Sequence, residues 1–585
     1  MTRANGAVAE ALGEFGELLS IVGGEPFKVR AYEKAARAVG EHPVDVADLD
    51  DKGIESIPSV GSHIAAKIRS LLETGHIDEL DELRARVPAG LRSLLGVPGL
   101  GPKRARQVYV ELGIASMSEL LDALHDERLR ELRGWGETSE TNLRRAIAQA
   151  QQTGGRMLLD VALGIAEELV ADLREVTGVH EAAYAGSLRR MCETIGDIDL
   201  LVAASDPRAV TDAFGRMDLV AEVPMRGPTK AVALTTKGVH VDLRVVSPEV
   251  WGAALLYFTG SKAHNIHLRT IAAHRGLKLS EYGLERVEDG TVLAATTEEQ
   301  VYERLGMSWV PPTLREDRGE IEAAARGTLP PLVEIRQIRG DLHVHTDLTD
   351  GLATLEDMVA AAQAHRYRYL AITDHAPLLH MERMTDEKAL DQRRRLQELG
   401  GRQGIALLHG SELNIQADGS LDWDDEFLAG FDILVASVHS AFSLSREDMT
   451  GRMIRAIEHP SVNIIGHPTA RSIGHRAPID FDVDAVFAAA GRAGTALEIN
   501  SFPDRLDLPE DLVRLAHERG TVFAISTDAH SVRHLDNMRY GVAVAQRGWL
   551  DPAQVINTWP LGKLQRFLSK GRSPNHRPKR RAVLS

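Results

Sequence analysis

Six short apolar stretches after residue 340 each end in, or run into, histidine and carboxylate residues, and this pattern constrains the fold more than any other feature of the sequence. The stretches are DLHVHTDLTDG, AITDH, LLHGSELNI, LVASVHS, IIGHP and FAISTDAH. Helical segments separate them, and alternating strands and helices predict a parallel βα barrel. In such barrels the polar residues at the carboxyl ends of the strands meet at one face and form the site.

The candidate ligands in these stretches are nitrogen and oxygen donors, with no cysteine among them. They are His343, His345, Asp350, His375, Glu412, His439, His467, Asp528 and His530. This set suits zinc, manganese or iron, and it exceeds what one ion needs. A single buried histidine is more often structural than a ligand, but so many donors placed at strand ends predict a metal centre.

A second group of carboxylates lies in the first half of the chain, in GSLRRMCETIGDIDLLV at residues 186–202. The run from Ile195 alternates apolar and polar residues, which predicts a strand with Asp197 and Asp199 on one face. Asp242, in VHVDLRVV, is the candidate for a third carboxylate on a neighbouring strand. Three carboxylates would form a two-metal site for phosphoryl transfer, whereas a surface strand with solvated aspartates is the simpler alternative. The Gly-Ser pair that opens the stretch offers backbone N–H groups and a hydroxyl to a phosphate.

Two glycine-containing turns that open helices recur near the amino terminus, in IPSVGSHIAAKI (57–68) and VPGLGPKRARQVYVELGI (97–114). Each turn can aim backbone N–H groups at a DNA phosphate without reading bases. Two copies in one chain therefore predict contacts with the DNA backbone, and the alternative is a pair of glycine-capped helical turns. The candidate contacts in these turns are Gly61, Gly99, Gly101 and Lys103.

The composition is that of a globular protein with several domains. A chain of 585 residues is too long for one core, and about three to four domains are expected. The net charge of -16 argues weakly against nonspecific binding to nucleic acid, although phosphate contacts need only local basic patches. The lone cysteine, Cys192, suits a reducing cytoplasm. No apolar run approaches the length of a membrane helix, and the amino terminus lacks a signal-peptide pattern.

The stretch at 186–202 resembles the nucleotidyltransferase motif of family X DNA polymerases, and the two glycine turns resemble the DNA-binding hairpins of that family. The segment YFTGSKAHNIHLR at 257–269 resembles the family's nucleotide-selecting helix, and the resemblance extends over residues 5–318. It implies a metal triad of Asp197, Asp199 and Asp242, in which Asp242 takes up the proton of the primer 3′-hydroxyl. It also implies nucleotide contacts from Gly186, Ser187, Arg190, Tyr257, Phe258, Gly260 and Asn265, and DNA contacts from Arg269 and Lys67. Lys67 matches the lysine that forms a Schiff base in the lyase reaction.

The histidine-rich half resembles the polymerase and histidinol phosphatase (PHP) domain, a distorted seven-stranded barrel that holds up to three metal ions. Glu412 is the natural bridging carboxylate in this comparison. The resemblance implies hydrolysis of a phosphate ester, and fusion to a polymerase implies that the substrate is the primer 3′ end. We therefore expect a 3′–5′ exonuclease, with abasic-site endonuclease activity as a further expectation.

Together these features predict a multidomain α+β and α/β chain. We expect helical DNA-binding domains at 1–90 and 91–150, a palm with a mixed sheet at 151–250, a thumb-like nucleotide-selecting subdomain at 251–325, a linker at 326–338, a distorted (β/α)7 PHP barrel at 339–575 and a basic tail at 576–585. The expected function is gap filling in base excision repair, using Mg²⁺ or Mn²⁺ in the palm and Mn²⁺, Zn²⁺ or Fe in the barrel. The expected partners are gapped or primer–template DNA and dNTPs, and we expect a monomer in the bacterial cytoplasm, associated with the nucleoid.

Two other function classes are compatible with the sequence. The chain could be a DNA-binding scaffold with vestigial sites, but all twelve expected metal ligands are present. It could also be a metallophosphoesterase acting on small phosphate monoesters, with the front half serving only for targeting. Assaying a chromogenic phosphate ester against a labelled primer separates these classes.

Overall fold

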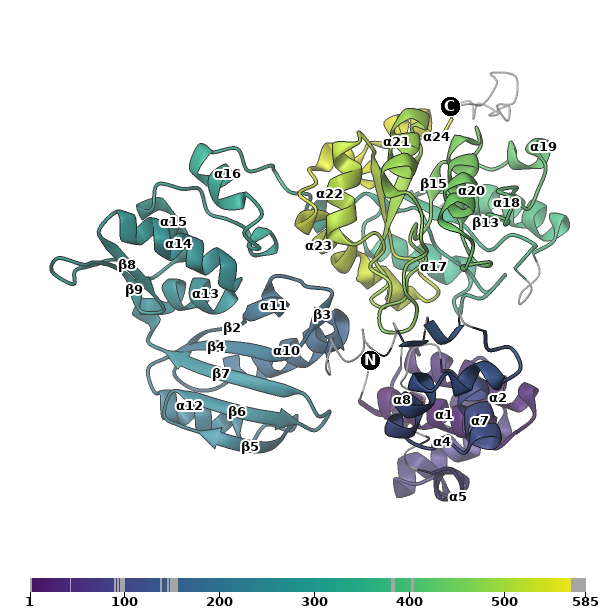
Figure 1. The fold of residues 1–585 in the computed structure, drawn as a ribbon, viewed down its shortest axis with the longest axis horizontal. Helices are drawn as coiled ribbons and strands as arrows, with labels where there is room; N and C mark the ends of the chain where they lie inside the picture. The colour runs from purple at the N-terminus through teal and green to yellow at the C-terminus, as the bar shows by residue number, and fades with distance from the viewer. Residues whose placement is uncertain are drawn as a thin grey trace.

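The computed structural model describes residues 3–42, 44–88, 91, 94, 100–136, 139–141, 143, 144, 147, 156–379, 384–400 and 404–569. Figure 1 shows a helical amino-terminal region, a middle region built on two sheets, and a barrel towards the carboxyl terminus. The predicted basic tail at 576–585 and the candidate DNA contact Gly99 lie outside the described residues. Among the helices described, none combines the length and apolar character needed to cross a bilayer.

The amino-terminal region consists of amphipathic helices around a single apolar core. The helices are α1 (Arg3–Ile21), α2 (Pro26–Gly40), α3 (Asp51–Glu55), α4 (Ser62–Thr74), α5 (Asp78–Arg86), α7 (Pro102–Leu112) and α8 (Met117–His125). Phe15 of α1 stacks on Tyr32 of α2 with 4.2 Å between ring centroids, which holds the first two helices together. Gly61 and Gly101 are the N-cap residues of α4 and α7, so both glycine turns do open helices.

The palm is a five-stranded mixed sheet, as expected. Its strands, in spatial order, are β2 (Val179–Tyr184), β4 (Ile198–Ala204), β7 (His240–Val246), β6 (Lys230–Thr235) and β5 (Val220–Arg226). Strands β4 and β7 run parallel, and the other neighbours are antiparallel. Helices α10 (Leu159–Arg174) and α12 (Pro207–Phe214) contribute to the core with this sheet.

The expected single strand from Ile195 to Val202 is wrong, because the strand is broken at Gly196 and Asp197. Ile195 belongs to the short strand β3 (Thr194–Ile195), which pairs with β1 (Met157–Leu158) in a separate ladder. Strand β4 begins only at Ile198, where the chain joins the main sheet. The bend leaves Asp197 just ahead of the strand that carries Asp199.

The expected thumb-like part packs helices against a small antiparallel sheet, which was not predicted from the sequence. Its elements are α13 (Trp251–Thr259), α14 (Lys262–His274), β8 (Leu277–Ser280), β9 (Gly283–Arg286), β10 (Val292–Ala294), α15 (Glu298–Arg304) and α16 (Glu320–Arg326). Helix α13 also covers the palm, because Leu201 of β4 packs against Ala254 and Leu255. Helix α13 therefore lies over the face of β4 that carries Asp199.

The barrel contains seven parallel strands, which confirms the predicted architecture. In order they are β11 (Gly340–Asp341), β12 (Tyr369–Ile372), β13 (Ala406–Asn414), β14 (Ile433–Ser437), β15 (Ile464–Ile465), β16 (Ala496–Asn500) and β17 (Phe523–Ser526). A parallel bridge between Val344 and Ala529 brings the first and last strands together, so the barrel is nearly closed. The expected strand through His343 and His345 is shorter than predicted, because β11 ends at Asp341 and the histidines follow it.

Helices alternate with these strands around the barrel (Figure 1). They are α17 (Leu355–Ala364), α18 (Asp386–Gly400), α19 (Asp425–Leu428), α20 (Arg446–Glu458), α21 (Val483–Ala493), α22 (Glu510–Glu518), α23 (Met538–Arg547) and α24 (Leu561–Leu568). The barrel contacts both other regions: Arg539 of α23 lies 3.0 Å from Glu167 of the palm, and His534 lies 3.4 Å from Glu41 of the helical region.

Candidate active sites

Two of the three predicted palm carboxylates, Asp199 and Asp242, lie together on one face of the sheet, and the third, Asp197, lies in the bend just before it. Asp199 of β4 and Asp242 of β7 are direct partners in the parallel ladder. Their neighbours Leu200 and Leu243 are buried in the core with α10 and α12, so both aspartates point to the opposite face. Asp197, at the bend before β4, is close enough for its charge to act on Asp199. The sheet register thus brings together residues that are far apart in sequence.

The electrostatics of this cluster favour a bound cation. Burial, with the negative charges of Asp197 and Asp242, raises the pKa of Asp199 to about 7. The positive charges of Arg190 and Arg244 offset this only in part. Like charges at this spacing resist simultaneous ionisation unless cations lie between them. An oxygen-only ligand set fits a hard divalent ion, so these carboxylates are suited to Mg²⁺ or Mn²⁺.

Gly186 is required by the close approach of Asp199. Its φ is +57°, and a Cβ atom at this position would lie only 2.1 Å from Oδ2 of Asp199. The glycine ends the connection from β2 and is followed by Ser187 in the short helix α11 (Gly186–Arg189). The backbone N–H of Ala185 donates to the carbonyl of Asp199 at 2.8 Å. The Gly-Ser turn therefore lies against the carboxylate cluster, where the sequence predicted a phosphate-binding turn.

Arg190 connects this turn to the thumb. Its Nη1 donates to the carbonyl of Thr259 at 2.7 Å, and its Nε donates to Oε1 of Glu316 at 3.0 Å. A Cβ atom on Gly260, whose φ is +68°, would lie 3.3 Å from the same Nη1. Arg190, Gly260 and the carboxylates therefore form one continuous region.

The predicted nucleotide-selecting residues gather on α13 and α14. Tyr257 and Phe258 form an edge-to-face pair with 5.2 Å between ring centroids. The side-chain amide of Asn265 donates to the carbonyl of Tyr257 at 2.7 Å. Arg269 lies one turn further along α14 and lines the same hollow as Tyr257 and Asn265. The Arg244 guanidinium lies 5.7 Å from the ring of Phe258, which links these aromatic rings to strand β7.

The predicted DNA-contacting residues of the helical region are not brought to the palm site. Gly61 and Gly101 lie in exposed turns, and Lys103 is an exposed residue in the first turn of α7. Lys67, on α4, forms an ion pair with Glu79 and lies 5.3 Å from the ring centroid of Phe15.

All nine predicted barrel ligands converge at the carboxyl ends of the strands. Glu412 lies at the centre, with its carboxylate oxygens between 2.9 and 3.6 Å from ring nitrogens of His343, His345, His375, His439 and His467. Asp528 lies 3.1 Å from His345, and Asp350 lies 3.1 Å from His530 and 3.3 Å from His375. The central place of Glu412 is where a bridging carboxylate would lie.

Three groups within this cluster have the geometry of metal sites. They are His345, Asp350, His375 and His530; His343, His345 and Asp528; and His375, Glu412 and His439. The ligand atoms of each group lie within 4.8 Å of one another. Shared members join the groups, so this arrangement fits more than one ion. Buried histidines with carboxylates suit transition metals better than magnesium.

Two residues that sequence reasoning missed orient these ligands. Glu498 of β16 is fully buried and lies 2.8 Å from Nδ1 of His343, and it accepts from the backbone N–H of His467 at 2.6 Å. Asn414 accepts through Oδ1 from Nδ1 of His439 at 2.8 Å. Contacts of this kind hold the rings of His343 and His439 through Nδ1 and would leave Nε2 to bind a metal. Glu498 could have been found in the sequence because it is a lone acid in the strand ALEIN. Burying an unpaired charge in a core strand is unfavourable, so such an acid indicates a partner.

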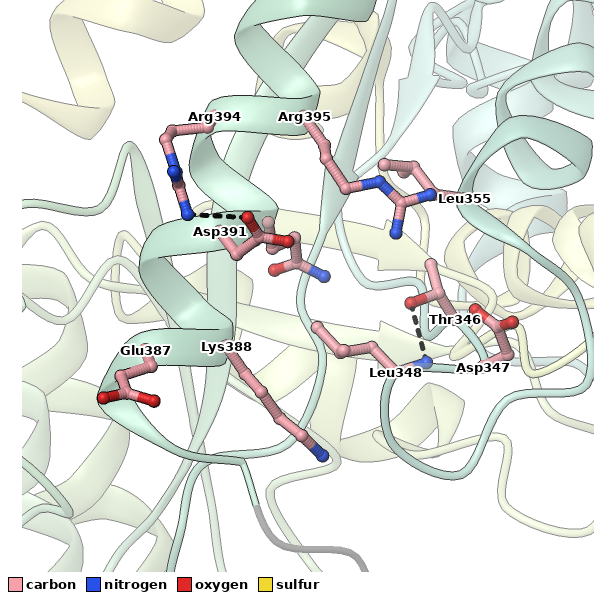
Figure 2. Close-up of a pocket in the computed structure, with 10 residues that line it drawn as sticks. Thr346, Asp347, Leu348, Leu355, Glu387, Lys388, Asp391, Arg394 and Arg395 are labelled. Atoms are coloured by element: carbon pink, nitrogen blue, oxygen red, sulfur yellow. Dashed lines mark hydrogen bonds and ion pairs between the residues drawn. The ribbon is translucent and has the colours of Figure 1, made fainter.

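A separate hollow of about 300 Å³ lies beside the loop that follows the first histidines. Figure 2 shows Thr346, Asp347 and Leu348 on one side of it, and residues of α18 on the other. Two cations here pair with acids: Arg394 lies 2.7 Å from Asp391, and Arg395 lies 2.9 Å from Glu356. The lining contains none of the nine predicted ligands, so the hollow is distinct from the metal centre.

A mixed sheet with a carboxylate cluster, helices opened by two glycine turns and a histidine-rich barrel together have the architecture of a nucleotidyltransferase-class polymerase joined to a phosphoesterase domain. Family profiles agree: a helix-hairpin-helix domain matches residues 3–77, a SAM-like helix-hairpin-helix tandem matches 51–113 and 91–149, the DNA polymerase beta thumb matches 254–316, and the PHP domain matches 341–502.

Comparison with individual proteins identifies the family within this class. The chain is 35% identical to the DNA polymerase/3′-5′ exonuclease PolX of Bacillus subtilis (strain 168), over 94% of this chain and 97% of the relative. It is 27% identical to DNA polymerase lambda of Rattus norvegicus, over 50% of this chain and 53% of that protein. For DNA polymerase lambda of Arabidopsis thaliana the identity is 24%, over 51% of this chain and 60% of that protein. The chain belongs to the family X DNA polymerases that carry a carboxy-terminal PHP domain, which confirms the predicted family.

Proposed function

We propose that this protein is a gap-filling DNA polymerase of base excision repair that also removes nucleotides from a 3′ end through its barrel. The observation that carries the proposal is the register of Asp199 against Asp242, with Asp197 and Gly186 beside them. A nucleotidyltransferase site of this family needs carboxylates close together beside a phosphate-binding turn, and this arrangement supplies both. The nine barrel ligands around Glu412 support the second activity in the same way.

In the palm, we assign the metal-binding role to Asp197, Asp199 and Asp242. Mg²⁺ or Mn²⁺ held by these carboxylates would neutralise charge on the primer 3′-hydroxyl and on the leaving pyrophosphate. Asp242 accepts the proton of the primer 3′-hydroxyl on its carboxylate. Gly186 and Ser187 present the turn to the triphosphate, and the Arg190 guanidinium supplies N–H donors to its oxygens.

The thumb residues select the nucleotide in this proposal. Tyr257, Phe258 and Gly260 abut the sugar and exclude a 2′-hydroxyl. Asn265 contacts the incoming base, and Arg269 contacts the template strand. The grouping of Tyr257, Asn265 and Arg269 around one hollow supports these roles.

In the barrel, the nine ligands would hold up to three ions of Mn²⁺, Zn²⁺ or Fe. Ions bound there would lower the pKa of water so that it can attack a phosphodiester at neutral pH. Glu412 holds the centre of the cluster, while Glu498 and Asn414 keep the histidine rings in orientation. The substrate we propose is the 3′-terminal phosphodiester of DNA, with an abasic-site backbone as a second substrate.

The helical region contacts gapped DNA in this proposal. Gly61 and Gly101 offer backbone N–H groups at the starts of α4 and α7, and Lys103 adds a phosphate contact.

Lys67 is the candidate lyase residue, and borohydride trapping on a 5′-deoxyribose phosphate end tests this role. Replacing Lys67 by Ala should abolish the trapped adduct, and an unchanged adduct would assign the reaction to another amine.

The proposed setting is the bacterial cytoplasm, where the protein acts as a monomer on nucleoid DNA with dNTPs as its second substrate. Light scattering of the purified protein, alone and with gapped DNA, tests the monomer. A mass of two chains in both samples would contradict it.

One experiment separates the two proposed sites. A labelled primer in gapped DNA with a 5′-phosphate is incubated with and without dNTPs, in Mg²⁺ and then in Mn²⁺. Asp199→Ala should abolish extension and retain degradation, whereas a variant with both His343 and His345 replaced by Ala should do the opposite. Normal extension by Asp199→Ala would show that the palm assignment is wrong.

A further inference from the structure

A residue of the barrel holds the arginine of the palm site. Arg547, the last residue of α23, is buried, and its Nη1 donates to the backbone carbonyl of Arg190 at 2.8 Å. The same Nη1 donates to Oε1 of Glu316 at 3.0 Å, and that oxygen also accepts from Nε of Arg190 at 3.0 Å. One carboxylate of the thumb therefore joins two guanidinium groups, one from the palm and one from the barrel.

The two guanidinium groups of Arg547 and Arg190 keep Glu316 ionised. Burial alone would raise the pKa of Glu316, but the charges of Arg547 and Arg190 lower it. Arg547 also donates through Nη2 to Glu510 at 2.8 Å, and Arg318 lies 3.8 Å from Glu510. Without Arg547, Glu316 would act on Arg190 with no second guanidinium to share its charge, and the attraction of Arg190 for an anion would weaken.

The contacts orient Arg190 without using up its donors. A guanidinium has five N–H groups. Glu316 takes the Nε donor, Thr259 takes one donor of Nη1, and Nη2 donates to Sγ of Cys192 at 4.0 Å, so one donor on each Nη is left for phosphate oxygens. Glu316 and Arg547 therefore act as a support behind the guanidinium.

A second contact ties the same loop to the barrel. Arg471 donates through Nη2 to Glu193 at 2.7 Å, three residues beyond Arg190. The Nε of Arg471 donates to the carbonyl of Arg505 at 2.8 Å, and the Arg505 side chain lies 3.8 Å from the barrel ligand Asp528. Both ends of the loop from Arg190 to Glu193 are thus fixed by barrel residues.

We propose that Arg547 is a positioning residue for the polymerase reaction: the barrel holds Arg190 in the orientation that binds the triphosphate of the incoming nucleotide. Nucleotide affinity in the palm therefore depends on a side chain of the nuclease domain. This inference rests on the proposed role of Arg190 in triphosphate binding.

The test compares gap-filling kinetics of the full-length protein with five variants. Arg547→Gln removes the charge, and Arg547→Lys retains it. Arg190→Gln removes the supported group itself, and the double variant combines it with Arg547→Gln. Arg539→Gln is the matched control, because it breaks another contact between α23 and the palm, the pair with Glu167, without touching Arg190. The measurements are KM for dNTP, kcat, the 3′–5′ exonuclease rate without dNTPs, and the melting temperature.

We expect Arg547→Gln to raise KM for dNTP at least about fivefold with kcat nearly unchanged, and Arg547→Lys to restore part of the loss. Arg539→Gln should keep the original KM, and the exonuclease rate of the Arg547 variants should not change. In the Arg190→Gln background, Arg547→Gln should add almost nothing, since its effect passes through that arginine.

Two results would overturn the inference, and they are distinguishable. If Arg190→Gln raises KM but Arg547→Gln does not, or if the two effects multiply in the double variant, the support role is wrong and the palm assignment stands. If Arg190→Gln leaves KM unchanged, the proposed triphosphate role of Arg190 fails and the inference fails with it. Should Arg547→Gln unfold, Glu316→Gln breaks the same bridge from the thumb side and must raise KM in its place.

Discussion

Replacing Gly186 by Ala offers a sharp test of the palm geometry, because two separate penalties can be worked out for it. The first is the backbone, since alanine at a φ of +57° costs about 1–2 kcal/mol. The second is steric, since the new Cβ would lie 2.1 Å from Oδ2 of Asp199. Relieving that overlap requires the carboxylate or the turn to move by about 1 Å, and displacement by that amount in a catalytic group costs about 100-fold in rate.

Gly178 provides the matched control in the same domain. Its φ is +87°, but nothing lies within 4 Å of a Cβ added there. Gly178→Ala therefore carries the backbone penalty without the contact with Asp199. Gly186→Ala should lower the melting temperature at least as much as Gly178→Ala does, because it adds the overlap with Asp199 to the same backbone penalty.

The assay is single-nucleotide gap filling in Mg²⁺, with the exonuclease rate measured on the same preparations. We expect Gly186→Ala to lose about 100-fold in kcat/KM for dNTP, and Gly178→Ala to stay within about threefold of the original protein. The exonuclease rate should be unchanged in both. If Gly186→Ala fills gaps as well as Gly178→Ala does, Asp199 does not need its observed position and the reasoning is refuted.

Two more predictions concern the acids of each site. Glu498→Gln should reduce metal retention or exonuclease rate about 10–100-fold, because the charge facing His343 is lost, while gap filling continues. The metal content of the protein after dialysis measures this effect. Full retention of metal would contradict the prediction. Asp199→Asn should stabilise the metal-free protein at pH 8 more than at pH 5, since burial and the charges of Asp197 and Asp242 raise the pKa of Asp199 to about 7. The folded state then binds the proton more tightly than the unfolded state, and stability falls as pH rises from about 4 to 7. Melting curves in chelator at both pH values measure the difference, and equal shifts would rule out this explanation.

The ligands of the barrel were predictable because a local rule places them. His439, His467 and Asp528 each lie two residues beyond the last residue of a short buried strand. Strand ends of a parallel barrel meet at one face whatever the rest of the chain does, so the sequence pattern is enough to bring them together. The same holds for Asp199 and Asp242, whose polar positions alternate with buried apolar residues on adjacent strands.

Other parts of the sites depend on information that no local pattern carries. Glu498 lies in a strand whose other residues are also buried. Its role in orienting His343 is evident only from the contact between the two side chains in the folded protein. The break at Gly196 follows from pairing of Ile195 with Met157, which competes with extension of β4. The contact of Arg547 with Arg190 joins residues that are 357 positions apart, and nothing in the periodicity of either segment points to the other.

The two sites also differ in the chemistry by which they select metals, and this difference explains how one chain can carry both. The palm offers carboxylate oxygens only, and the raised pKa of Asp199 makes ion binding there sensitive to protonation near neutral pH. The barrel offers six histidines with three central acids, a set that favours transition metals and keeps them in a buried place. The histidine rings also need a fixed orientation, which Glu498 and Asn414 provide for His343 and His439, whereas the three palm carboxylates include no ring to orient.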